Sequence, residues 1–434
     1  MILFLKKKFK QFNHYFLKFD NYLIIFLFFS ITIFGSLYFS YVFALRFEQI
    51  VVNNAIILKE IPFNHGNLIN NLLVNSEYKV TDRYGGLDLF LDRLPALSFI
   101  SIAISKISLN IYIFLLIKNI IFFGLFFFIS RNYWNSYSKN SYVLILISFA
   151  IFFNFYNFQT SLNFTYADSY ISILLPCLYL VLLKDVNHKS APTVSLLLIF
   201  LFFLKTTMLY VVIVLSIIFL IERKKEVFKE KAYLPLISLI SCMIIWGCFG
   251  YIKTGKIPFL HHTLSTNQQA LALVYNKKFN DIYPHIIVDQ IYAEIVDAEI
   301  IDKGLPRYEN EWEVNDYFKK RNIEYFKENK IEIIKGTIKK INFLFFYVKW
   351  DNKIYLSHIL NRIIFFISLV ILVYKFFNKK LIFKDSYFFI ILVTFLFPYM
   401  VGWITHKHLP PLYIVSYLYS LINIYELNFK KKYY

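Results

Sequence analysis

The feature that most constrains this chain is a series of long apolar blocks that recurs along the whole sequence. A helix needs roughly 20 apolar residues to cross the hydrocarbon core of a bilayer. Backbone amides find no water to bond in that core, and a helix satisfies them within one segment. The sequence therefore predicts an all-α integral membrane protein, a single polytopic domain over residues 1–434, with apolar blocks at 22–45, 111–129, 142–158, 168–183, 193–221, 234–251, 359–377, 387–404 and 412–425.

Composition and charge agree with a membrane location. Only 17% of the residues are charged, whereas soluble domains carry about a quarter, and 58% are hydrophobic. A formal net charge of +19 would point to nucleic acid in a soluble protein. Here the lysines concentrate in short loops between apolar blocks, as the positive-inside rule expects. The lipid bilayer is thus the expected partner, and nucleic acid is not.

The loops predict the topology of the chain. The block 193–221 is longer than one span and is interrupted by Lys205-Thr206-Thr207, so we expect two spans that meet at an outer turn. This gives about ten transmembrane helices, with the Lys-rich loops and both termini in the cytoplasm. A composition rich in Lys, Ile, Asn and Phe is typical of an AT-rich bacterial genome, which places the protein in a bacterial cytoplasmic (inner) membrane.

Two longer polar segments interrupt the apolar pattern. We expect residues 46–94 to be the first extracytoplasmic loop and 252–356 to be a large extracytoplasmic loop. Residues 309–349 within the second read as a helix, because acidic residues open the stretch and lysines follow later, as the helix dipole favours. Residues 95–108 are apolar but interrupted, which indicates a helix lying at the membrane interface.

The chain carries no motif of a soluble enzyme, neither a Walker loop, a strand-linked GxGxxG, HExxH, CxxC nor GxSxG. Its three cysteines, Cys177, Cys242 and Cys248, have no metal-ligand spacing and indicate no disulfide framework. What remains are ionisable residues at the ends of spans or inside them. Charges in lipid are costly, so such residues are functional candidates by default.

Six short polar motifs follow one another along the chain. They are Arg46-Phe47-Glu48-Gln49, Asp92-Arg93-Leu94-Pro95, Thr165-Tyr166-Ala167-Asp168-Ser169-Tyr170, Phe203-Leu204-Lys205-Thr206-Thr207, Trp246 with Tyr251-Ile252-Lys253-Thr254-Gly255, and His406-Lys407-His408-Leu409-Pro410-Pro411. In this order they resemble the C-type glycosyltransferase superfamily (GT-C), polytopic enzymes that take sugars from polyprenyl-phosphate donors. The nearest types are the protein mannosyltransferases and the aminoarabinose transferases. Glu48 stands where the family commonly has Asp, and Lys205 where it often has Arg.

The resemblance implies transfer of a sugar from a polyprenyl-phosphate-linked donor to a glycan, lipid or protein acceptor on the extracytoplasmic side. It implies Glu48 as the catalytic base, with Asp92 and Asp168 as supporting acids. An acceptor hydroxyl must lose its proton as it attacks, which requires a carboxylate. The leaving phosphate gains negative charge, which fixed cations stabilise; the resemblance assigns this role to Arg93, Lys205, His406, Lys407 and His408. No metal-binding set is evident, and a divalent metal requirement stays open.

Simpler interpretations remain beside these roles. Glu48 can also be interpreted as a solvated residue of an amphipathic loop helix. Asp92 and Arg93 can be interpreted as a local ion pair. Asp168 could cap the start of its helix, and Lys205 could extend toward the interface. Lys118, deeper in its span, predicts a buried pair with Asn119 or with another helix. For the whole chain, the alternatives are a flippase or transporter of lipid-linked glycans without catalytic activity, and a structural or assembly protein.

Overall fold

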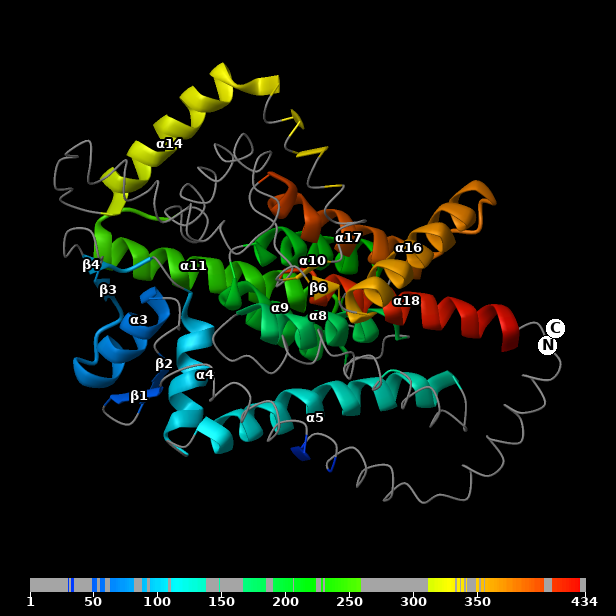
Figure 1. Cartoon of the computed structure of the whole chain (residues 1–434), viewed down its shortest axis with the longest axis horizontal. Helices are drawn as coiled ribbons and strands as arrows, with labels where there is room; N and C mark the ends of the chain where they lie inside the picture. Colours follow the sequence, from blue (N-terminus) through cyan, green and yellow to red (C-terminus); the bar gives the residue numbers. More distant parts are fainter. Residues whose placement is uncertain are drawn as a thin grey trace.

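The computed structural model shows a predominantly helical protein, which confirms the predicted helical fold class (Figure 1). Most of the described residues belong to apolar helices, and short strands occur in the connecting segments. The structure describes residues 30, 33–34, 49–52, 55–58, 63–81, 88–91, 94–107, 111–137, 148, 167–184, 190–205, 207–223, 228, 231–258, 311–331, 334–335, 337–338, 341, 349–350, 353–354, 356–401 and 408–429.

The helices of the main bundle coincide with predicted apolar blocks. They are α5 (Ile111–Tyr137), α8 (Ala167–Leu183), α9 (Ser190–Leu204), α10 (Met208–Glu222), α11 (Leu234–Thr254), α16 (Leu356–Phe377), α17 (Phe383–Val401) and α18 (Pro410–Phe429). The predicted interruption of the block 193–221 is confirmed. The helix breaks at Lys205, whose carbonyl accepts a 3.0 Å hydrogen bond from the amide of Met208 at the start of α10. The predicted spans at 22–45 and 142–158 lie outside the described residues, apart from isolated positions.

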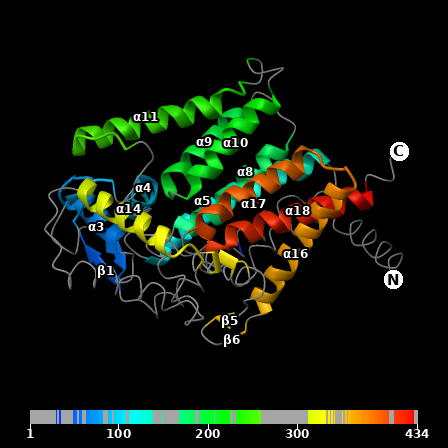
Figure 2. The same cartoon turned by 90° about the horizontal axis from the view of Figure 1, so that it is seen from above.

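The two polar segments contain the remaining elements. The first holds α3 (Phe63–Val74) and is followed by α4 (Pro95–Ser105), which begins on a proline as helices often do. The second holds α14 (Glu311–Glu328), which lies within the predicted helix 309–349. In two views, α3, α4 and α14 gather at one end of the bundle helices (Figures 1 and 2).

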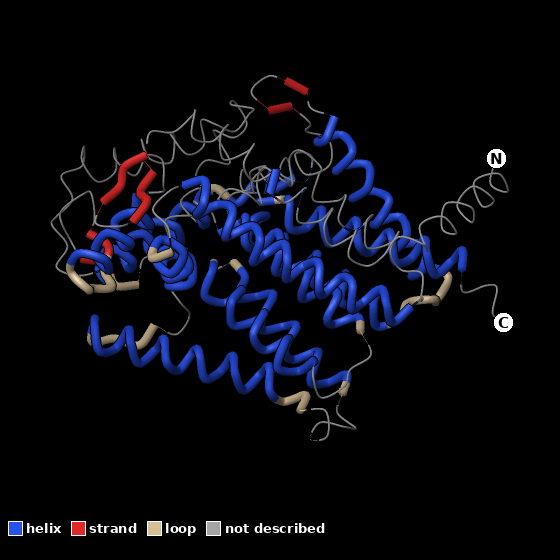
Figure 3. Tube along the Cα trace, turned by 90° about the horizontal axis from the view of Figure 1, so that it is seen from below, coloured by secondary structure: helices blue, strands red, loops and turns tan. Residues whose placement is uncertain are grey.

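Three small antiparallel ribbons were not expected from the sequence. β1 (Gln49–Val52) pairs with β2 (Ala55–Leu58), with Gln49 opposite Leu58 and Val52 opposite Ala55. Successive β-branched residues favour strands over helix in both segments. The other ribbons pair β3 (Val80–Thr81) with β4 (Asp88–Leu89), and β5 (Lys349–Trp350) with β6 (Lys353–Ile354). Figure 3 shows the ribbons outside the helical body.

Three helices within the described part of the chain are long and apolar enough to cross a membrane. These segments are Leu116–Asn135, Leu234–Thr254 and Ile359–Phe377. α8, α9 and α10 are apolar but have 17, 15 and 15 residues, fewer than the roughly 20 of a straight span. A membrane association follows from the three long helices, while the count of about ten spans stays a prediction.

The helices of the bundle run in both directions, so each end of the bundle brings together particular helix starts and helix ends. At one end, here called the site end, α9 stops, and α8, α10 and α18 begin. At the other end, here called the basic end, Lys375 of α16 bonds to Asp385 of α17 at 2.8 Å, and Lys384 bonds to Glu426 of α18 at 2.6 Å. Tyr387 donates to Glu222 at the end of α10. These contacts connect α10, α16, α17 and α18 at the end of the bundle where the turns are rich in lysine.

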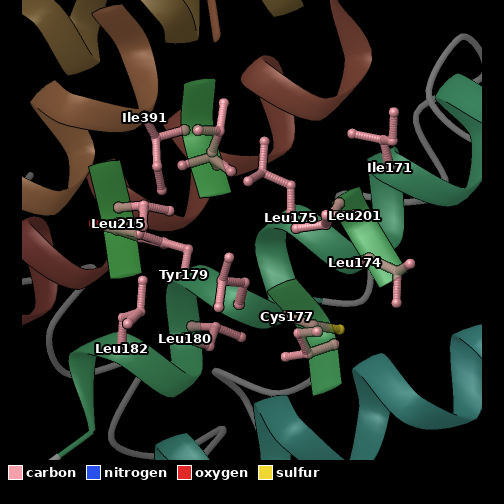
Figure 4. Packing of buried hydrophobic residues seen from close by; sticks show 14 of the residues in the cluster. Ile171, Leu174, Leu175, Cys177, Tyr179, Leu180, Leu182, Leu201, Leu215 and Ile391 are labelled. Carbon is pink, nitrogen blue, oxygen red and sulfur yellow. The ribbon is translucent and has the colours of Figure 1, made fainter. Parts of the chain in front are cut away.

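The core is centred on α8, which packs against α5, α9 and α18. Fifteen of its 17 residues are buried, although Pro176 interrupts its hydrogen-bond ladder. Figure 4 shows its apolar side chains packed with Leu201 of α9, Leu215 of α10 and Ile391 of α17. The first residues of α8 therefore lie at the site end of a helix that the rest of the bundle buries almost completely.

Candidate functional site

A buried ion pair joins two predicted site residues at the site end. Asp168 lies in the first turn of α8, and Lys205 directly follows α9. The Lys205 Nζ donates to both carboxylate oxygens of Asp168, at 2.8 and 2.9 Å. The side chain of Asp168 is 4% exposed and that of Lys205 17% exposed. Lys205 thus turns inward toward α8 rather than outward to the interface, and Asp168 binds another helix with both oxygens.

Tyr399 of α17 contacts Lys205 of this pair and also residues of two other helices. The Lys205 Nζ lies 5.3 Å from the centroid of its ring, within cation–π range. The ring stacks on the imidazole of His408 with centroids 4.7 Å apart. The Tyr399 hydroxyl and the Thr207 hydroxyl are 3.2 Å apart and share a hydrogen bond. One tyrosine therefore contacts side chains at the end of α9 and at the starts of α10 and α18.

The electrostatics of this group favour a strongly held pair. A charge taken out of water costs several kcal/mol unless an opposite charge and hydrogen bonds compensate it. Asp168 and Lys205 compensate each other, and the ring of Tyr399, itself stacked on His408, lies against the Lys205 ammonium. Such a preorganised cation can stabilise an incoming anion better than a hydrated surface lysine.

A second lysine reaches the start of α8 from a different helix, α5. Lys118 of α5 is fully buried, its Nζ lies 3.4 Å from the hydroxyl of Ser169, and it sits 4.9 Å from the centroid of the Tyr170 ring. The predicted buried contact of Lys118 is therefore made with another helix. Because Ser169 follows Asp168 directly, two lysines flank the first turn of α8.

An aromatic cluster borders the site end and ties the first polar segment to the bundle. Trp246 and Phe249 of α11 stack with ring centroids 5.3 Å apart, and Tyr78 meets both rings edge-on. Leu91 and Leu94 pack in the same cluster, as does Phe203, two residues before Lys205. The residues flanking Asp92-Arg93 in sequence are thus anchored beside the end of α9.

The structure brings together Asp168, Lys205 and His408, three predicted site residues from distant parts of the sequence. The other predicted residues, Glu48, Asp92, Arg93, His406 and Lys407, lie outside the described residues. The predicted convergence of Arg93 with Lys205 on one phosphate therefore stays a prediction. Within the described part of the chain, no three His, Cys, Asp or Glu side chains group so that they could hold a metal ion.

Two features of the site end were missed by sequence reasoning. Tyr399 gave no signal, because one tyrosine among many at the end of an apolar block has no distinguishing pattern. Arg362 of α16 did give one: it lies inside a predicted span, where a charge indicates function by default, and it is 6% exposed. No family model, curated protein or solved structure matches this chain. The resemblance to the GT-C superfamily consequently rests on the order of its motifs.

Proposed function

We propose that the protein is a membrane glycosyltransferase of GT-C type that moves a sugar from a polyprenyl-phosphate donor to an acceptor outside the cytoplasm. The observation that carries this proposal is the convergence of Asp168, Lys205 and His408 around Tyr399. These residues come from three of the motifs on which the family resemblance rests. A cation held by a carboxylate at the end of an apolar bundle suits a donor whose phosphate is polar and whose tail stays in lipid.

The proposal gives the cationic residues and the acidic residues different tasks in the reaction. Lys205 binds the donor phosphate and stabilises the charge that develops on it as the sugar leaves. Asp168 holds Lys205 at the site end, so that the ammonium is in place before the donor arrives. Glu48 takes the proton from the acceptor hydroxyl, with Asp92 in support. Arg93, His406, Lys407 and His408 complete the phosphate-binding side.

The distribution of charge supports an outward-facing site end. Turns at the basic end carry Lys231, Lys379 and Lys380 beside the ion-paired lysines, which is the pattern of cytoplasmic loops. Since the site end lies at the opposite end of the bundle from these turns, it then faces the extracytoplasmic side. Donors linked to polyprenyl phosphate carry their own leaving group, so transfer on that side requires no nucleotide.

A transfer assay tests the proposal. The purified full chain, in proteoliposomes, is mixed with a panel of polyprenyl-phosphate sugars and a crude envelope fraction as acceptor, and sugar transfer is measured. We expect activity with at least one donor, and Lys205→Ala to lower it by about 10²-fold, the scale of losing one charge-stabilising group. Lys380→Ala, an exposed lysine at the basic end, serves as the control and should retain activity.

Two results would contradict transfer. One is turnover that is equal in the wild type and Lys205→Ala. The other is movement of an intact lipid-linked sugar across the bilayer with no change in its covalent bonds, which would favour the flippase alternative.

A further inference from the structure

Two turns at the basic end share an unusual combination of residues. Before α11, Phe228 is 87% exposed and its carbonyl accepts a 3.4 Å hydrogen bond from the amide of Lys231. After α16, Phe376 is 63% exposed and its carbonyl accepts a 3.0 Å bond from the amide of Lys379. Each turn thus carries an exposed phenylalanine and, three residues later, a lysine. These two pairs are called the Phe–Lys turns below.

The backbone conformation distinguishes the two lysines. Lys231 and Lys379 both have φ of 54°, and Ser76 is the only other non-glycine residue of the described chain with a positive φ. This left-handed conformation is common after helix ends, but glycine usually adopts it there, because a Cβ makes it costly. A strained backbone persists mainly where it serves a function. A lysine in this conformation therefore indicates a use for its side chain.

Both turns lie at the level of a membrane boundary. α16 and α11 each contain one of the three segments long enough to cross a membrane, Ile359–Phe377 and Leu234–Thr254. The lysine of each turn is two or three residues from the nearer end of its segment. The end of a helix that spans the hydrocarbon core lies beside the lipid headgroups. Tyr387 of α17 bonds to Glu222 of α10, so both turns lie at the same end of the bundle, away from α3 (Figure 2).

Positive charge and apolar surface occur together at this boundary. The lysines of both turns are exposed. Around the second turn the exposed apolar side chains are Phe376, Phe377, Leu381 and Ile382. An acidic soluble protein or a nucleic acid would complement the lysines, but it would leave these apolar side chains in water. The surface of a bilayer offers phosphates and acyl chains at adjoining depths, so it complements both.

We propose that the two Phe–Lys turns bind anionic phospholipid, with the lysine ammonium groups on lipid phosphates and the phenylalanine rings among the neighbouring acyl chains. Anionic headgroups attract each lysine near the membrane surface, and aromatic side chains favour the same boundary. The turns contain none of the residues assigned to glycosyl transfer. The inference therefore holds whether or not the chain transfers a sugar.

Lipid binding to the purified full chain in dodecyl maltoside tests the proposal. Dioleoyl phosphatidylglycerol, dioleoyl phosphatidylcholine and inorganic phosphate are titrated separately, and native mass spectrometry gives the dissociation constants. We expect phosphatidylglycerol to bind at least ~10-fold more tightly than phosphatidylcholine, and Lys231→Gln to weaken its binding about fivefold, the effect of one lysine near an anionic surface. Phe228→Ser should weaken the binding of both lipids. Lys327→Gln, which changes an exposed lysine of α14, is the matched control and should change neither.

Lys379→Gly distinguishes lipid binding from a purely structural role of the turn. Glycine adopts a positive φ without strain, so the thermal midpoint in lipid-free detergent should stay the same or rise. The affinity for phosphatidylglycerol should nevertheless fall about fivefold, because the ammonium is lost.

Four results would overturn the proposal. The first is equal affinity of the wild type for the two lipids, and the second is unchanged affinity for phosphatidylglycerol in Lys231→Gln and Lys379→Gly. The third is tight binding of inorganic phosphate that phosphatidylglycerol does not displace. The fourth is a stable dimer that Phe228→Ser dissociates, because the phenylalanine would then contact a second copy of the chain.

Discussion

At the scale of single residues, the buried charges of Asp168 and Lys205 compensate each other. Asp168 is a buried carboxylate in the first turn of α8, and an unpaired charge there would lower the stability of the fold. Both of its oxygens accept hydrogen bonds from Lys205, which compensates that charge. The ring of Tyr399 lies against the Lys205 ammonium, and it also stacks on the imidazole of His408. This arrangement keeps the Lys205 ammonium at the site end and mostly buried, so that it does not bind anions from solution indiscriminately.

A double-mutant cycle measures how tightly the two charges depend on each other. Asp168→Asn or Lys205→Met alone leaves one buried charge uncompensated, and each should lower the free energy of unfolding by about 3 kcal/mol. The double variant removes both charges and should recover a large part of that loss. Unfolding by SDS in mixed micelles, followed by circular dichroism, gives the three differences. Losses that simply add in the double variant would mean that the pair is not coupled.

At the scale of elements, the end of α11 shows how closely the polar segments are fitted to the bundle. Gly255 ends this helix with φ +72°, a left-handed conformation that glycine adopts without strain. The chain then turns back so that Pro258 lies on Gly250: a Cβ added there would come within 2.4 Å of the proline Cδ. The same helix carries Trp246 and Phe249 of the aromatic cluster, so this turn supports the border of the site end.

The fit at this turn gives a stability prediction. Gly250→Ala forces the rigid ring of Pro258 to move and should lower the free energy of unfolding by about 1–3 kcal/mol, the usual cost of overpacking. Gly124→Ala in α5 is the matched control, because no heavy atom lies within 4 Å of its added Cβ. That change should be neutral or should stabilise by about 0.5–1 kcal/mol, since glycine weakens a helix interior. The two variants are compared by the same SDS unfolding. An unchanged Gly250→Ala variant would contradict the close packing.

The elements also show what the sequence could and could not predict. The blocks that became α5, α11 and α16 are bounded by polar residues, so their positions were predictable. The break at Lys205 was predictable because three polar residues interrupt an apolar run. The pairing of β1 with β2 was not, because strands of four residues depend on a partner segment. The position of Tyr399 beside Lys205 was hidden as well: a helix that is apolar all round does not indicate which face is buried.

At the scale of the whole molecule, the two ends of the bundle have different characters. The basic end carries lysine-rich turns and the ion pairs Lys375–Asp385 and Lys384–Glu426, which hold the helices in register. The site end carries aromatic clusters and buried cations beside α3, α4 and α14 (Figure 2). This difference between the two ends is what the proposed function requires, because the proposed lipid-linked donor binds at one face only.

The most direct test of this account is where the donor phosphate binds. A cryo-EM structure of the full chain in nanodiscs, with a non-hydrolysable analogue of a polyprenyl-phosphate sugar, would show that position. We predict the phosphate at the site end, with an oxygen about 2.7–2.9 Å from the Lys205 Nζ and the prenyl tail running into lipid. A phosphate bound only at the basic end, with Lys205 still enclosed by Asp168 and Tyr399, would contradict the proposed function.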